Sequence, residues 1–96
     1  MEIKCYVPQI KDLETAIRIY YSNSHIGSSE IKELFGYLSG SKIASLKNAV
    51  RDEMKKRNIM QYSLYTVDVE VAYEVWGISI EALERKYNKL KKLGLV

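Results

Sequence analysis

The stretch "ELFGYLSGSKIASLK" (residues 33–47) recurs in altered form as "EVWGISIEALE" (residues 74–84). In both stretches an acidic residue and two apolar residues precede a glycine, an apolar residue and a serine follow it, and an Ile and a Leu three residues apart come next. A glycine after an apolar run is typical of a helix end, because it adopts the left-handed conformation without strain. Each stretch therefore predicts a short helix, a glycine turn and a second helix, which together form a helix-turn-helix.

Apolar residues at helical spacing extend this prediction along the chain. Each expected helix has an apolar stripe at spacings of three and four residues, over about 9–22, 28–36, 41–57 and 80–94. Ser28 is the expected N-cap of the second of these, and Ser39 or Ser41 that of the third. Residues 2–7 alternate and predict a short strand or an extended arm, after which Pro8 suits the first turn of a helix.

The segment 59–71 leaves two interpretations open. Its valines alternate with polar residues as in a strand, but Thr66 or Asp68 is also a suitable N-cap for a helix that ends near Trp76. The repeated pattern favours the helix. A winged helix with a β-wing at 59–71 is the alternative, ranked second because the segment contains no Asn-Gly or Asp-Gly turn.

The predicted fold class is mainly α, with four to five helices. We expect a single domain over residues 1–96 in which a tandem of two helix-turn-helix units shares one core. The first unit and its preceding helix cover 9–58, and the second, degenerate unit covers 66–96. Apolar residues before each glycine are expected to pack on those after it: Ile31, Leu34 and Phe35 on Leu38, Ile43 and Leu46, and Ala72, Val75 and Trp76 on Ile78, Ile80 and Leu83.

Charge is distributed unevenly along the chain. Residues 41–57 carry six basic and two acidic side chains, and residues 85–96 carry five basic and no acidic ones. Residues 58–84 carry five acidic and no basic side chains, while the whole chain has a net charge of only +3. Basic charge concentrated in this way indicates an anionic partner such as DNA. The plainer explanation is that basic helix ends complement the helix dipole.

Several other functional classes find no support in the residues. The chain has no apolar run near the roughly 18 residues that span a membrane and no signal-peptide pattern, so we expect a cytoplasmic protein. Cys5 is the only cysteine, which excludes an internal disulfide and fits a reducing compartment. His25 is the only histidine and has no second His or Cys near it in sequence. We therefore predict no metal, no cofactor and no enzymatic activity.

The helix at 41–57 is the expected recognition helix. Opposite its apolar stripe it presents polar residues near its N-terminal end, among them Ser45 and Asn48 as candidate base readers, Asn being suited to adenine. Basic residues beside them are expected to contact phosphates and to set the register, whereas Asp52 would repel phosphates. The predicted DNA-binding set is Ser41, Lys42, Ser45, Lys47, Asn48, Arg51 and Lys55. An ordinary solvated helix face is the plainer alternative.

The second unit is a poorer candidate for reading DNA. Its second helix begins with Glu81 and Glu84, which phosphates repel, and its basic residues lie further along the helix. We expect this unit to stabilise the first. Its apolar seam is short for a coiled coil, so ordinary core packing is favoured and a homodimer contact is the alternative.

Three stretches carry a resemblance that covers most of the chain. They are "SSEIKELFG" (28–36), "LKNAVRDEM" (46–54) and "VAYEVWGISIEALERKYNKLKKLGL" (71–95). These stretches resemble a group of small proteins encoded by bacterial prophages and integrative elements. The resemblance implies a helix-turn-helix DNA-binding regulator of a mobile element and implies no catalytic residue.

The expected function is therefore that of a small DNA-binding protein. We expect a transcriptional regulator of a bacterial phage or mobile element that reads the major groove of double-stranded DNA with helix 41–57. One alternative is an architectural, excisionase-like factor that bends DNA. Another is a protein–protein interaction module on a helix-turn-helix scaffold, which the acidic segment 58–84 supports.

Overall fold

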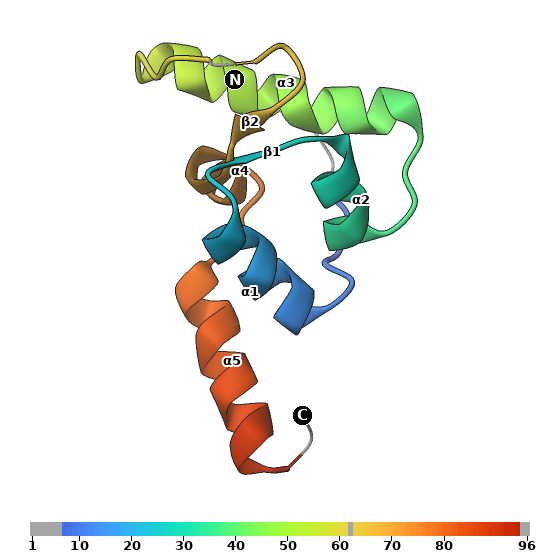
Figure 1. Ribbon diagram of the computed structural model, residues 1–96, viewed down its shortest axis with the longest axis vertical. Coiled ribbons are helices and arrows are strands. Elements are labelled where there is room, and N and C mark those ends of the chain that lie inside the picture. Colours follow the sequence, from blue (N-terminus) through green and yellow to red (C-terminus); the bar gives the residue numbers. More distant parts are fainter. Residues whose placement is uncertain (1–6, 62, 95–96) are drawn as a thin grey trace.

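Five helices and one two-stranded sheet make up the protein in the computed structural model, which describes residues 7–61 and 63–94 (Figure 1). The expected mainly helical fold class is confirmed. The elements in chain order are α1 Leu13–Ser22, β1 His25–Ile26, α2 Ser28–Phe35, α3 Gly40–Lys56, β2 Val67–Asp68, α4 Val69–Val75 and α5 Ile80–Lys92. The strand or arm predicted at 2–7 lies outside the described residues apart from its last residue.

The first helix starts later than the sequence predicts. α1 begins at Leu13 because the carboxylate of Asp12 caps it, accepting a hydrogen bond of 3.0 Å from the backbone N–H of Thr15. The prediction of a helix from residue 9, with Pro8 in its first turn, is wrong. The segment before α1 instead has no regular secondary structure and bends at Lys11, and the N–H of Lys11 donates to the carbonyl of Leu34 at 2.8 Å, which ties this segment to α2.

The first helix-turn-helix unit consists of α2, a four-residue turn and α3. Gly36 has a positive φ of 93°, a conformation that an L side chain rarely adopts. Ser39, rather than Ser41, caps α3, and its hydroxyl accepts a hydrogen bond of 3.2 Å from the N–H of Lys42. The N-cap of α2 is Gly27 rather than Ser28.

The second unit consists of α4, a turn of the same length and α5. The carboxylate of Asp68 caps α4 by accepting from the N–H of Val71 at 3.0 Å, so the predicted helix in the second half of 59–71 is confirmed. Gly77 has a φ of 75°, and the hydroxyl of Ser79 caps α5 by accepting from the N–H of Ala82 at 3.2 Å. The two units therefore use the same local devices, a left-handed glycine and a capping serine.

A small sheet joins the segment before α2 to the segment before α4. β1 and β2 pair antiparallel, with His25 opposite Asp68 and Ile26 opposite Val67. The sequence predicted β1 as part of a polar loop, so this strand was missed. In the described part of 59–71 the strand residues are those of β2, and β2 pairs with β1 rather than with a neighbouring strand of that segment. The β-wing alternative at 59–71 is therefore not observed in the described residues.

One core contains side chains from both units. The ring of Trp76, in the second turn, meets the ring of Phe35 edge-to-face with centroids 5.6 Å apart. Its indole N–H donates to the carbonyl of Leu46 in α3 at 3.2 Å. Tyr73 of α4 is 1 % exposed and its hydroxyl donates to the carbonyl of Ala16 in α1 at 2.6 Å. These contacts join α1, α3 and α4, so the two units share one core.

The hydroxyl of Tyr73 gives a test of this core. We expect Tyr73→Phe to lower the free energy of unfolding by about 1 kcal/mol, because a buried donor to Ala16 is lost while the ring still fills its space. Urea denaturation measures the change. The matched control is Tyr37→Phe, whose side chain is 88 % exposed and for which we expect a change within about 0.5 kcal/mol. Equal effects of the two substitutions would contradict the role assigned to Tyr73.

Candidate nucleic-acid interface

The outer side of α3 is the most extended polar face of the first unit. α3 has 17 residues, which at 1.5 Å per residue gives a length of about 25 Å. It lies along one edge of the molecule (Figure 1), with its inner side packed against α4 and β2. The outer side of this helix is therefore left to solvent or to a partner.

Small side chains occupy the outer side near the start of α3. Ser41, Ala44, Ser45 and Asn48 are all exposed, as the sequence predicts for the three polar members of this set. Their small size permits a close approach of the helix backbone to a partner surface. Hydroxyl and amide groups both donate and accept hydrogen bonds, so this end of α3 can read donors and acceptors on base edges.

Basic side chains lie at both ends of α3, with more of them at its C-terminal end. Lys55 and Lys56 are exposed in the last turn of α3, and Lys42 is half-buried in its first turn. Asp52 is also exposed. Arg57 does not add a free charge, because its guanidinium forms ion pairs of 2.8 Å and 2.7 Å with Glu53 and Glu74.

Lys47 does not lie where the sequence analysis expected it. Its side chain is only 9 % exposed, and its ammonium donates to the hydroxyl of Ser28 at 3.0 Å and to the carbonyl of Tyr65 at 2.8 Å. The prediction of a solvent-facing phosphate contact at Lys47 is therefore wrong. The spacing contained the signal, because Lys47 lies four residues after Ile43 and three before Val50, on the core side of the helix.

Arg51 has a similar structural role one turn further along α3. Its guanidinium donates through Nη2 to the carbonyl of Leu64 at 2.5 Å, and its Nε is buried without a hydrogen-bond partner. Arg51 therefore has a structural contact as well, and its role as a phosphate contact stays a prediction. Together, Lys47 and Arg51 attach two consecutive backbone carbonyls of the segment between α3 and β2 to the side of α3.

The segment held in this way carries exposed apolar side chains. Met60, Leu64 and Tyr65 are 66 %, 77 % and 74 % exposed, and they belong to the connection between α3 and β2. Exposed apolar side chains that cluster on one segment often mark a contact surface. The sequence analysis does not identify this surface, because the same segment also fits a strand.

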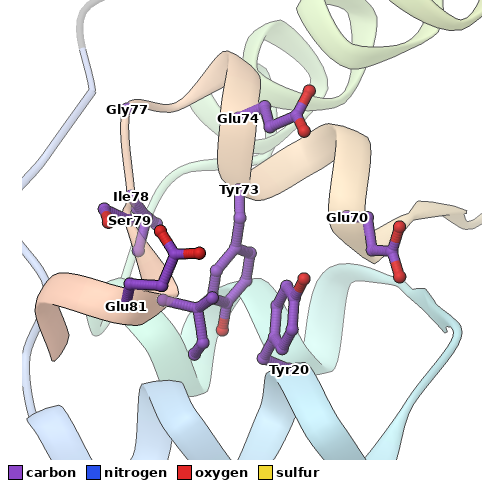
Figure 2. A pocket seen from close by; sticks show the side chains of 9 residues that line it. Tyr20, Glu70, Tyr73, Glu74, Gly77, Ile78, Ser79 and Glu81 are labelled. Carbon is purple, nitrogen blue, oxygen red and sulfur yellow. The ribbon is translucent and has the colours of Figure 1, made fainter. Parts of the chain in front are cut away.

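A second surface feature lies on the other side of α4. Two adjoining hollows of about 470 and 760 Å³ share Tyr20, Glu70, Ile80 and Glu81 in their linings. Figure 2 shows Glu81 beside the ring of Tyr73 and Glu70 further along α4, whereas the carboxylate of Glu74 points away from the rings. We call this feature the acidic groove; its carboxylates are those of Asp68, Glu70, Glu74, Glu81 and Glu84.

The carboxylates of the acidic groove influence the pKa of Tyr20. Partial burial, and then the charges of Glu70, Glu74, Glu81 and Asp68, raise the pKa of the Tyr20 phenol. The hydroxyl of the neighbouring Tyr21 donates to the Glu84 carboxylate at 2.5 Å. This negative field makes the groove unsuitable for DNA and suitable for a cation.

The described residues form neither a metal-binding cluster nor a membrane-spanning helix. In residues 7–61 and 63–94, no three His, Cys, Asp or Glu side chains come together in a way that could hold a metal ion. No helix in the same part of the chain is long and apolar enough to cross a membrane. His25 lies in β1, and the hydroxyl of Ser24 lies 3.0 Å from its Nδ1.

The buried ammonium of Lys47 predicts a pH dependence. Burial, and next the charge of Arg51, lower the pKa of Lys47 below the 10.5 of a free lysine. Between the lowered pKa and 10.5 the unfolded chain binds more protons than the folded one, so this group makes folding more favourable as pH rises. We expect the free energy of unfolding of wild type, relative to Lys47→Met, to increase as pH rises towards 10.5.

Urea denaturation at a series of pH values measures this difference. Lys55→Met is the matched control, because it removes one exposed positive charge from the same helix. A difference between wild type and Lys47→Met that falls with rising pH would contradict the assignment of Lys47 as a buried ammonium.

Comparison with known proteins gives no relative. No protein-family model, no curated protein sequence and no solved structure matches the chain. Its function is therefore inferred from its own residues and their arrangement.

Proposed function

We propose that the protein binds double-stranded DNA and reads the major groove with the N-terminal half of α3. The observation that supports this most is the outer side of α3, a long exposed helix face that begins with Ser41, Ser45 and Asn48. α3 is the second helix of a helix-turn-helix and is accessible along its length. The major groove of DNA is wide enough to admit such a helix.

The order of side chains along α3 supports a division of roles. Small hydrogen-bonding residues come first, where a recognition helix meets base edges, and exposed lysines come last, where the helix leaves the groove near the phosphates. We assign Ser45 and Asn48 to base contacts, and Lys42, Lys55 and Lys56 to phosphate contacts. Lys47 and Arg51 act indirectly in this proposal, by holding the connection to β2 beside the helix.

The second unit has a supporting role in the proposal. The first turns of α5 carry Glu81 and Glu84 at the acidic groove, and the start of this helix packs against α1. Carboxylates near phosphates are repulsive, so α5 is a poor recognition helix. Through Trp76 and Tyr73 the second unit instead stabilises α3 and α1.

The biological setting in the proposal rests on the resemblance of the sequence. We place the protein in the bacterial cytoplasm as a transcriptional regulator of a prophage or integrative element. An excisionase-like architectural factor would use the same helix, and would differ in bending its DNA site strongly without regulating a promoter. A protein–protein module on this scaffold would use the acidic groove and would not bind DNA even at low salt.

The salt dependence of DNA binding tests the proposed phosphate contacts. With three lysines at phosphates, we expect the logarithm of the binding constant to fall with the logarithm of salt concentration with a slope of about −3. Lys55→Ala combined with Lys56→Ala should make the slope shallower by about 2, because two counterions fewer are released. Fluorescence anisotropy on a duplex too short for two proteins measures the slope.

The matched control removes the same charge from α5, by Lys91→Ala combined with Lys92→Ala. We expect its slope on the short duplex to equal that of wild type. No binding of wild type at low salt would contradict the proposed function. Binding with an unchanged slope for the α3 variant would show that other residues contact the phosphates.

Asn48 gives a test of base reading. On a site selected from random duplexes, we expect Asn48→Ala to weaken binding about 5- to 150-fold, because a bidentate contact to adenine contributes about 1–3 kcal/mol. Binding to unrelated duplexes should change little. If the ratio of the mutant to the wild-type dissociation constant were the same on the selected and the unrelated duplexes, a base contact by Asn48 would be contradicted.

A further inference from the structure

The last turns of α5 form a basic end in which Lys89, Lys91 and Lys92 are exposed in the part of the chain that the structure describes. Within α5 only Leu83 is buried, and Figure 1 shows the helix running past α1 away from the body. Beyond Glu84 the helix carries basic residues and no acidic ones: Arg85, Lys86, Lys89, Lys91 and Lys92. Leu93, just after the helix, is 66 % exposed. We call residues 85–93 the basic end.

The acidic groove complements the basic end in charge, and its apolar floor suits the apolar parts of that end. Five carboxylates line the groove. Among the described residues, Glu84 accepts from Tyr21, Glu74 pairs with Arg57, and Asp68 caps α4. Glu70 and Glu81 are exposed at its rim. Tyr20 and Ile80 give it an apolar floor, which suits the long aliphatic stems of lysines and a leucine.

The last lysines of the basic end, Lys89, Lys91 and Lys92, cannot reach the acidic groove of their own chain. Glu81 and Lys91 belong to one continuous helix, and their ten-residue separation corresponds to about 15 Å along its axis. A straight helix cannot fold back on its own first turn. A contact between these lysines and an acidic groove therefore requires a second molecule.

We propose that the acidic groove binds the basic end of α5 of a second copy of this chain. Because each copy has one groove and one basic end, two copies can exchange both contacts around a two-fold axis with their α5 helices antiparallel. The contact covers Leu93 and gives the carboxylates of the groove cationic partners. It involves no residue of the outer side of α3 and is independent of the proposed DNA binding.

Complementary charge reversal tests the proposal. The groove variant is Glu70→Lys combined with Glu81→Lys, and the end variant is Lys89→Glu combined with Lys92→Glu; all four side chains are exposed. Circular dichroism and thermal unfolding establish that both variants fold as wild type does. Sedimentation equilibrium without DNA then measures the dissociation constant of the dimer, alone and in a 1:1 mixture of the variants.

We expect wild type to dimerise at low salt and to dissociate as salt shortens the screening length from about 30 Å at 0.01 M to about 8 Å at 0.15 M. Each variant alone should show a dissociation constant at least about tenfold higher, since attractive pairs become repulsive. The mixture should restore dimers, because each groove then meets an end of opposite charge.

Three results would overturn the proposal. They are a wild type that is monomeric at low salt and high concentration, a variant that dimerises as tightly as wild type, or a mixture that stays monomeric although both variants are folded. None of these results bears on α3, because DNA binding is measured separately on a duplex that accepts one protein.

Discussion

The buried ammonium of Lys47 is the contact on which the first unit depends. It joins three parts of the chain, because it extends from α3 and donates to Ser28 at the start of α2 and to Tyr65 just before β2. Removing an ammonium from water is costly unless its donors are satisfied, so both acceptors have to stay in place. This requirement fixes α3 relative to the sheet and leaves only its outer side available for contacts.

The helices were largely predictable because their causes are local. An apolar stripe, a capping serine and a left-handed glycine set α3 and α5 to within two residues of the expected bounds. β1 was not predictable, since two residues have no periodicity and their pairing with β2 joins segments about 40 residues apart. The late start of α1 was not predicted, because Pro8 and Asp12 are both suitable starting signals and the carboxylate of Asp12 is the one that caps the helix.

The candidate site was predictable only in part. Ser41, Ser45 and Asn48 lie opposite the apolar stripe, so helical geometry alone places them outside. The charge of Lys47 predicts a surface residue, although its spacing from Ile43 and Val50 puts it on the inner side. A long aliphatic stem allows such a residue to cross the edge of a core and place its charge beside backbone carbonyls. The acidic groove could not be predicted from the sequence, because it combines residues of α1, α4 and α5 that are far apart along the chain.

Trp76 has a consequence for how this protein can be observed. It is the only tryptophan in the chain, it is 5 % exposed, and its indole N–H is bonded to the backbone of α3. Indole emission is sensitive to water and to hydrogen bonding, so the tryptophan fluorescence of the molecule, excited selectively over that of the tyrosines, originates at a single junction between the two units. Spectral shifts during unfolding, or on addition of a partner, therefore report whether α3 and α4 stay together, without any label.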